Sequence, residues 1–467
     1  MFTPELIYAV FIISLGYFVV LTVYYIFLAL IGSYEETKRV LSGEEENYSL
    51  FYFSPLKIPV SFIVPAHNEE DWIKDSLRSL ISLNYPEFEV IVVNDGSTDR
   101  TLEVLNDILK LRPVDMMYIR HYKDGRMRGI LKSELYPNVT VVDKDRGNKK
   151  AGAVNAGLNI AKNNYICVID ADTVLERDAL LKVMVQVEKE PDKVIGVGSY
   201  FGLVNGFKIK DGAVMERSFS YNPIVAYQNI EYIRSFIGNR LAWSKYNATP
   251  ILAGGFSVWR KDVVYELGGF DVDFTCEDAE FTFRAHEYLV KNKEKNYKII
   301  MLPFYVGWTE GPSNIGSLIM QRNRWQRVID ETVWTYKHMI CNPKYGLFAF
   351  LTLPYFLLYE VLGVFMELLG ICFVAAGAMM SVVKWEVFFA YFGLMLLIQT
   401  FTTLLSMLAF VESQRLFRLK YLAYLIGLSF VEFFFYRWIL SIAKIQGTVD
   451  FLYKKKSHEK YVRQKRA

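Results

Sequence analysis

Two carboxylates, Asp170 and Asp172, stand one residue apart directly after the apolar run Tyr165–Ile169. Carboxylate oxygens are ligands that Mg²⁺ and Mn²⁺ prefer, and such an ion neutralises a nucleotide diphosphate. An acid at the end of a buried strand is costly without a partner, which favours a ligand site over a pair of solvated loop acids. The spacing therefore predicts a divalent-ion site at this strand end.

Two further polar clusters also follow apolar runs, at residues 65–70 (PAHNEE) and 94–99 (NDGSTD). Ligands of open parallel sheets bind outside the carboxyl ends of the strands, and small polar residues ahead of a helix expose N–H groups suited to phosphate. Turn and cap chemistry is the alternative, since Ser97 or Thr98 can cap a helix. Two such clusters at successive strand ends favour a ligand site.

Three later segments carry charged side chains that can act on a phosphate or a hydroxyl. Lys149 and Lys150 precede a run of small residues that opens a helix, where a lysine can meet phosphate; a solvated basic pair is the alternative. Glu277 and Asp278 begin an amphipathic helix, either as acids favoured by the helix dipole or with one carboxylate as a general base. Segment 321–327 (QRNRWQR) offers arginine to a leaving diphosphate and tryptophan to a sugar face, unless it is an interfacial basic-aromatic belt.

The composition limits the classes of protein that can carry these motifs. The 467 residues include 53 Lys and Arg against 50 Asp and Glu, and the net charge of +3 argues against a nucleic-acid partner. Hydrophobic residues make up 52% and charged residues 22% of the chain, which indicates a water-soluble domain joined to membrane helices. The four cysteines lie far apart, so we expect neither a disulfide framework nor a structural zinc site.

Residues 59–302 have the pattern of an α/β domain. Short β-branched runs such as Val60–Val64, Val90–Val93 and Val139–Val142 alternate with helical spacing of leucine and isoleucine. This alternation predicts a mostly parallel sheet with helices on both faces. Lys123–Lys132 is predicted to be a surface loop.

Apolar segments at both ends predict membrane helices. Residues 7–32 carry no charge and would form a helix of about 39 Å, against a hydrocarbon core of about 30 Å. Lys38 and Arg39 follow, which places the N-terminus outside and residue 33 onward in the cytosol. Val387–Val411 predicts a second uncharged span.

The number of C-terminal spans stays open. Residues 346–383 are too many for one ordinary span, and segment 421–442 contains Glu432 and Arg437, which are unfavourable in lipid unless they face protein. The last 24 residues hold eight basic and two acidic side chains, typical of a tail at the cytosolic surface near anionic lipid.

Together, these motifs resemble the membrane-integrated family 2 glycosyltransferases, the group of cellulose synthase, hyaluronan synthase and poly-N-acetylglucosamine synthase. The resemblance covers about residues 55–345 and rests on four motifs in the family's order, namely the Asp95 cluster, Asp170-x-Asp172, Cys276-Glu277-Asp278 and Gln321-x-x-Arg324-Trp325. It implies an α/β GT-A fold beside transmembrane helices, and inverting transfer of a sugar, usually from a UDP-sugar, to a growing β-linked polysaccharide. Single addition to a lipid or lipid-linked acceptor is the alternative, and a non-catalytic transporter or nucleotide sensor is a third.

The resemblance also implies roles for individual residues. Asp278 takes the place of the catalytic base, Asp172 that of the ligand of Mg²⁺ or Mn²⁺. The residues implied in donor binding are Glu69, Asp95, Lys150 and Asp170. Those implied in holding the diphosphate and the acceptor are Glu277, Gln321, Arg324 and Trp325. Cys276 stands where the family usually has threonine, and this departure, among others, leaves processivity open.

The implied partners are a nucleotide sugar, a glycan or lipid-linked acceptor and membrane lipid, with the protein in the cell membrane and its catalytic domain in the cytosol. Whether a small accessory membrane subunit takes part stays open. The predicted parts are an N-terminal transmembrane helix (1–33), a linker (34–57), a GT-A domain (58–310), interfacial helices (311–345), a C-terminal transmembrane bundle (346–443) and a basic cytosolic tail (444–467).

Overall fold

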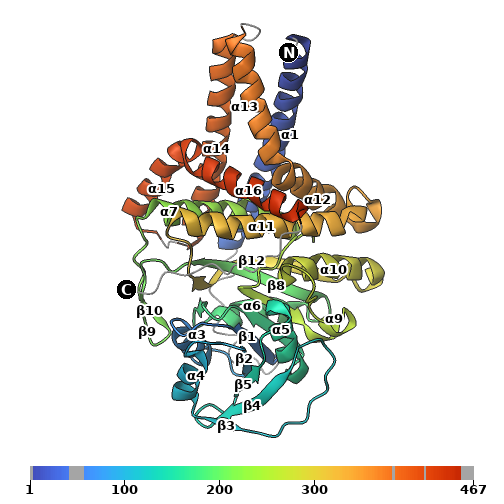
Figure 1. Cartoon of the computed structure of the whole chain (residues 1–467), viewed down its shortest axis with the longest axis vertical. Coiled ribbons are helices and arrows are strands. Elements are labelled where there is room, and N and C mark those ends of the chain that lie inside the picture. The colour runs from blue at the N-terminus through green and yellow to red at the C-terminus, as the bar shows by residue number, and fades with distance from the viewer. Residues whose placement is uncertain (1–3, 42–56, 381–383, 415–416, 454–467) are drawn as a thin grey trace. The chain divides into compact units, whose positions relative to one another are not determined.

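The computed structural model describes residues 4–41, 57–380, 384–414 and 417–453 (Figure 1). The chain forms two compact units. A helical unit draws on Met1–Ser42, Tyr221–Tyr246 and Pro312–Val462, and an α/β unit draws on Gly43–Ser220 and Asn247–Gly311.

A ten-stranded sheet, in the order β3-β4-β5-β2-β1-β6-β11-β8-β12-β7, forms the centre of the α/β unit. Its strands are β1 (Val60–Ala66), β2 (Phe88–Asp95), β3 (Leu111–Pro113), β4 (Met127–Ser133), β5 (Val139–Lys144), β6 (Tyr165–Ile169), β7 (Val174–Leu175), β8 (Val194–Leu203), β11 (Phe256–Arg260) and β12 (Lys298–Thr309). Strands β5, β2, β1 and β6 pair in parallel, as the sequence predicts, so their carboxyl ends share one edge. Antiparallel pairs flank them on both sides.

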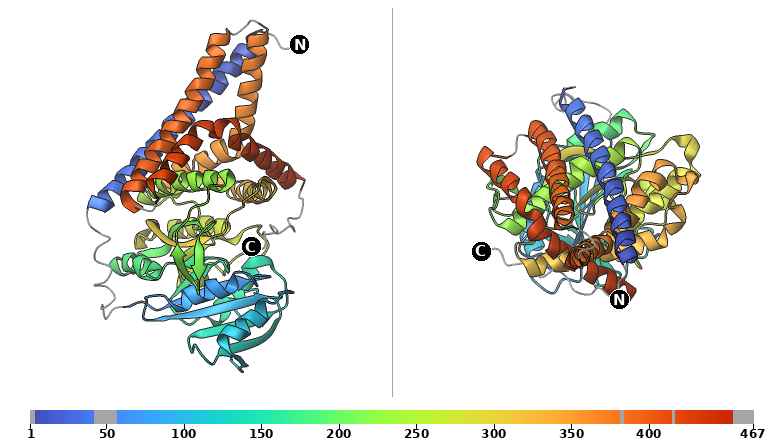
Figure 2. Two further views of the ribbon diagram at one scale, coloured as in Figure 1. Left: turned by 90° about the vertical axis from the view of Figure 1, so that its left-hand side faces the viewer. Right: turned by 90° about the horizontal axis from the view of Figure 1, so that it is seen from above.

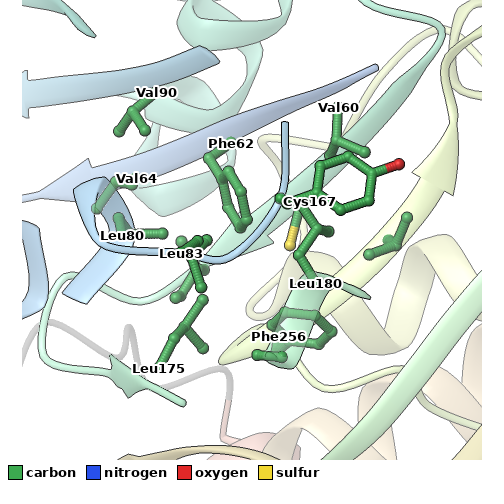
Figure 3. Packing of buried hydrophobic residues seen from close by; sticks show 14 of the residues in the cluster. Val60, Phe62, Val64, Leu80, Leu83, Val90, Cys167, Leu175, Leu180 and Phe256 are labelled. Carbon is green, nitrogen blue, oxygen red and sulfur yellow. The ribbon is translucent and has the colours of Figure 1, made fainter. Parts of the chain in front are cut away.

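Helices and a small hairpin complete this unit. The helices are α3 (Ile73–Ile81), α4 (Thr101–Leu109), α5 (Lys149–Ile160), α6 (Ala179–Lys189), α9 (Lys261–Glu266), α10 (Glu277–Lys291) and the short 3-10 turn η2 (Lys293–Lys295), and the hairpin strands are β9 (Lys208–Lys210) and β10 (Ala213–Glu216). Figure 3 shows how Phe62, Leu80, Leu180 and Phe256, from strands and helices far apart in the sequence, meet in one buried core. Each fully buried side chain of this kind contributes about 1.5–3 kcal/mol to stability.

The predicted surface loop over Lys123–Lys132 is wrong in its second half, where β4 begins at Met127. This strand pairs antiparallel with β5, with Ile130 opposite Val142. Only Ile130 and Ser133 of β4 are buried, so the strand shows almost none of the apolar alternation from which strands are predicted.

The helical unit contains the long apolar helices. Figures 1 and 2 show α1 (Pro4–Leu41), α13 (Gly363–Met379) and α14 (Trp385–Gln414) side by side. The other elements are α7 (Pro223–Ile233), α8 (Leu241–Lys245), α11 (Ile315–Thr335), α12 (Leu353–Tyr355), α15 (Leu419–Val431), α16 (Tyr436–Leu452), the π-helical turns η1 (Arg234–Arg240), η5 (Phe348–Thr352) and η6 (Phe356–Val361), and the 3-10 turns η3 (Lys337–Met339), η4 (Pro343–Tyr345) and η7 (Glu432–Phe434).

Among the described residues, two helices are long and apolar enough to cross a membrane, Ile12–Arg39 and Trp385–Leu408. Two bent pairs raise the number to four if each counts as one span, Phe348–Val361 with Gly363–Met379 at 49° and Leu419–Phe434 with Tyr436–Leu452 at 54°. The first pair lies in the segment that the sequence shows to be too long for one span.

The observed units differ from the predicted parts in two places. Helix α1 continues past residue 33 to Leu41, and the buried ion pair between Glu36 and Arg39 (2.8 Å) stabilises its last turns. Tyr221–Tyr246, which was predicted to lie in the GT-A domain, belongs to the helical unit, because the buried side chains of α7 pack against α14 and α15. The other predicted boundaries stay predictions.

Candidate active site

The loops after β1 and β2 hold each other in shape. The backbone N–H of Asn68 donates to Ser97 Oγ (3.1 Å), that of Thr98 to Asn68 Oδ1 (2.8 Å), and that of Glu69 to Thr101 Oγ1 (2.8 Å). These small polar side chains therefore form hydrogen bonds that stabilise the two loops. For Ser97 and Thr98 the turn interpretation accounts for the residue, whereas the role of Glu69 in donor binding stays a prediction.

Asp95, the last residue of β2, differs from its neighbours because it pairs with a cation. Its Oδ1 accepts a hydrogen bond from Nζ of Lys144, which has no exposed surface, while 10% of the Asp95 side chain is exposed. The next residue, Gly96, has φ 59°, and a Cβ there would lie 2.5 Å from the backbone N of Arg146. Glycine is thus required for this turn to pack against the loop after β5.

Lys150 joins three elements of the α/β unit. From the first turn of α5, its Nζ lies 2.6 Å from Asp170 Oδ1 beyond β6 and 2.9 Å from Glu277 Oε1 at the start of α10. Burial by itself lowers the pKa of Lys150, but Asp170, Glu277 and Asp278 together raise it well above its ordinary value. The ammonium therefore stays charged at neutral pH, among the carboxylates that the sequence analysis singled out.

The carboxylate of Asp278 is held by hydrogen bonds to both oxygens. Oδ2 accepts from the backbone N–H of Gly254 (2.7 Å), and Oδ1 accepts from the N–H of Ala279 (2.7 Å) and the thiol of Cys276 (3.1 Å). A Cβ at Gly254 would lie 2.7 Å from Lys150 Nζ and 3.2 Å from Asp278 Oδ2. A side chain at this position would therefore displace Lys150 or Asp278 from the cluster. Gly254 was not among the residues selected from the sequence, although the Gly254-Gly255 pair before an apolar strand was a visible indication.

Asp170 and Asp172 lie at the turn between β6 and β7. Asp172 is buried, whereas 40% of the Asp170 side chain is exposed. Among the described residues, no three His, Cys, Asp or Glu side chains are grouped to hold a metal by themselves. The two carboxylates fit Mg²⁺ or Mn²⁺ only as partial ligands, with the remaining oxygens supplied by a phosphate group or water, as is common for these ions.

The motif of the helical unit lies on α11 and divides between two faces. Arg324 and Trp325 are exposed, and Gln321 Oε1 accepts a hydrogen bond from Arg322 (2.7 Å). Arg322, which the sequence analysis did not select, is buried, pairs with Glu231 of α7 (2.6 Å) and lies 4.0 Å from the Trp325 ring centroid. Its position inside the motif was the only indication in the sequence.

Comparison with known proteins places this arrangement in a family. The model of "Glycosyl transferase family 2" matches residues 61–268, and that of "Glycosyl transferase family group 2" matches residues 165–436, more than half of the chain. The chain belongs to glycosyl transferase family group 2. This membership confirms the family that the sequence motifs predict.

Two relatives match part of the chain. Poly-beta-1,6-N-acetyl-D-glucosamine synthase of Staphylococcus epidermidis is 29% identical over 57% of this chain and 53% of its own length. "Probable glycosyltransferase YdaM" of Bacillus subtilis is 27% identical over 68% of this chain and 65% of its own. The chain thus spans about half to two thirds of the length of these relatives.

A mannosyltransferase from Pyrobaculum calidifontis, solved with GDP-Man and Mn²⁺, superposes with a TM-score of 0.56 at 17% identity, covering 92% of this chain and all of its own. At this identity the likeness concerns the fold, and it confirms the predicted GT-A fold.

Proposed function

We propose that this chain is a membrane-bound inverting glycosyltransferase that moves a sugar from a nucleotide sugar to a growing β-linked polysaccharide. The observation that carries the proposal is the cluster of Lys150, Asp170, Glu277 and Asp278, which sets a charged ammonium beside an oriented carboxylate in a family of glycosyl transferases. The staphylococcal relative, named as a polysaccharide synthase, supports polymerisation over single addition.

Asp278 is the proton acceptor in this proposal. The N–H groups of Gly254 and Ala279 orient its carboxylate, which takes the proton from the acceptor hydroxyl as that oxygen attacks the anomeric carbon. Attack on the face opposite the leaving diphosphate inverts the anomeric configuration, so an α-linked donor gives a β-linked product. No covalent enzyme intermediate is needed.

Lys150 contributes positive charge for the diphosphate. In the absence of donor its ammonium is shared between Asp170 and Glu277, and a bound diphosphate competes for it. Asp172 and Asp170 would hold Mg²⁺ or Mn²⁺, which when bound neutralises charge on the leaving diphosphate. Glu69 and Asp95 bind the nucleoside in this proposal, and Gln321, Arg324 and Trp325 hold diphosphate and acceptor.

The membrane location belongs to the same proposal. The two apolar helices Ile12–Arg39 and Trp385–Leu408 support anchoring in the cell membrane, and Lys38 and Arg39 support a cytosolic catalytic unit. That side of the membrane also supplies nucleotide sugars.

The test is a donor screen with full-length protein in nanodiscs. Radiolabelled UDP-N-acetylglucosamine, UDP-glucose and GDP-mannose are offered separately, and nucleotide release and product length are measured, with Asp278→Asn as the inactive reference. We expect release with one UDP-sugar and a product of many residues. A single added sugar would support the lipid-acceptor alternative, and no release with any donor would contradict the proposal.

A further inference from the structure

Lys144, the last residue of β5, is a lysine with no exposed surface. Burying an ammonium costs free energy unless the group is paired with an opposite charge and hydrogen-bonded. Its Nζ donates to the carboxylate of Asp95 and to the carbonyl oxygens of Asp145 (2.8 Å) and Gly147 (3.3 Å). All three hydrogens of the ammonium therefore have acceptors.

These acceptors lie on two different segments, which Lys144 joins. Asp95 ends β2, whereas Asp145 and Gly147 belong to the loop that leads into α5. The same two segments touch where Gly96 packs against the backbone of Arg146. Two residues after the loop, Lys150 meets the carboxylates of the candidate active site. Lys144 thus stands between Asp95 and the part of α5 that carries Lys150.

The hydrogen bonds leave one oxygen of Asp95 for a ligand. Oδ1 accepts from Lys144, while Oδ2 accepts no hydrogen bond from the described residues, and part of the side chain is exposed. An ionised carboxylate accepts hydrogen bonds and donates none, so this oxygen requires an N–H or O–H from its ligand. The base of uridine or guanosine offers a ring N–H, whereas cytosine and adenine carry a lone pair at the corresponding ring nitrogen.

We propose that Lys144 is a positioning residue for the nucleotide donor. It holds Asp95 as an acceptor for the ring N–H of the base and, through Asp145 and Gly147, sets the distance from that contact to Lys150 and the diphosphate. The inference rests on the proposed function in that the ligand is a nucleotide. Lys144 itself does not touch the nucleotide in this proposal; it acts through Asp95 and through the loop of Asp145 and Gly147.

The test measures dissociation constants of full-length protein for UDP and N3-methyl-UDP by calorimetry, because methylation removes the ring N–H and leaves the diphosphate intact. A hydrogen bond to a charged group corresponds to roughly 10- to 100-fold in affinity. We expect the wild type to prefer UDP by about this factor, and Lys144→Met to bind UDP more weakly and to lose the preference. Lys208→Met, at an exposed lysine of β9 paired with Glu216, is the matched control and should keep both.

A double variant covers the case in which Lys144→Met alone does not fold. Asp95→Asn with Lys144→Met leaves no buried lone charge. Its preference for UDP over N3-methyl-UDP should match that of Asp95→Asn alone, since Lys144 acts on the base contact through Asp95. Unchanged preference for UDP over N3-methyl-UDP in Lys144→Met, or a preference in the double variant that differs from that of Asp95→Asn alone, would overturn the inference. A wild type that binds no nucleoside diphosphate would overturn the proposed function itself.

Discussion

Asp278 accepts hydrogen bonds on both carboxylate oxygens. Asparagine keeps the shape of this side chain, but its NH₂ group accepts neither a hydrogen bond nor the proton of the acceptor hydroxyl. We expect Asp278→Asn to lower the turnover number by about 10²–10⁴, the range for loss of a general base, with a nearly unchanged dissociation constant for UDP. Stopped assays of labelled sugar transfer and calorimetry with UDP measure the two quantities.

Glu277→Gln is the matched control for that variant, because Glu277 is next to Asp278 on α10 but forms an ion pair with Lys150. It should cost less turnover than Asp278→Asn. Equal loss of UDP binding and turnover in Asp278→Asn would show that the carboxylate caps the helix rather than accepting a proton.

Asp172 is expected to be a ligand of the divalent ion. It is buried beside the half-exposed Asp170, and the pair offers hard oxygen ligands to a divalent ion. We expect excess EDTA to stop transfer, Mn²⁺ or Mg²⁺ to restore it, and Asp172→Ala to weaken Mn²⁺ binding measured by electron paramagnetic resonance. Transfer by Asp172→Ala at the wild-type rate in EDTA would exclude the metal site.

One face of helix α11 is buried, and the other face carries the exposed residues that we propose to act on the substrates. Arg322 is buried against Glu231, whereas Arg324 and Trp325 are exposed and point about 100° apart. We expect Arg324→Ala to abolish transfer and Trp325→Ala mainly to shorten the product, because an aromatic contact with sugar is worth about 1 kcal/mol. Nucleotide release and product length, normalised to folded protein, measure both.

Arg327→Ala on the same helix lies outside the three selected positions and serves as the control, with near-normal transfer expected. If α11 is only an interfacial belt, Arg324→Ala will reduce membrane insertion and leave the specific activity of the surviving protein near normal.

The buried His286 of helix α10 should make the free energy of unfolding depend on pH. Burial lowers the pKa of His286 from 6.5 to about 4, although its hydrogen bond with the Thr249 carbonyl opposes the shift. Between these pH values the unfolded chain binds a proton that the folded chain does not, so the free energy of unfolding falls as the pH drops from 6.5 towards 4. The full contribution is about 3 kcal/mol at most.

His286→Gln removes the titration and keeps a donor for the carbonyl. Thermal melting of both full-length proteins between pH 7 and 4.5 should show a larger loss for the wild type. Parallel losses would mean that His286 contributes nothing to the acid sensitivity.

The orientation of the whole molecule in the membrane can be tested with single cysteines. Met117 is fully exposed on the α/β unit, and the basic residues after the first apolar helix predict that this unit lies in the cytosol. In a variant with Cys341 and Cys372 replaced by serine, Met117→Cys should react with an impermeant maleimide only after cell lysis. Thr3→Cys, ahead of the first span, should react in intact cells; the reverse pattern would contradict the orientation.

The local pattern of the sequence determined the strands β1, β2, β5 and β6 and the motifs that follow them. This was possible because burial on a sheet and turn chemistry at a strand end depend on residues adjacent in the chain. The weakly apolar strand β4 was missed for the same reason, since a mostly exposed strand carries no such pattern.

Only the tertiary structure decided which charges meet. Lys150 lies between Asp170 and Glu277, Lys144 is buried against Asp95, and Gly254 lies next to the ammonium of Lys150. Periodicity reports the environment of one segment, whereas the partner that neutralises a charge comes from segments far away along the chain. The sequence therefore named most of the chemical groups, and the packing of the sheet and helices determined their partners.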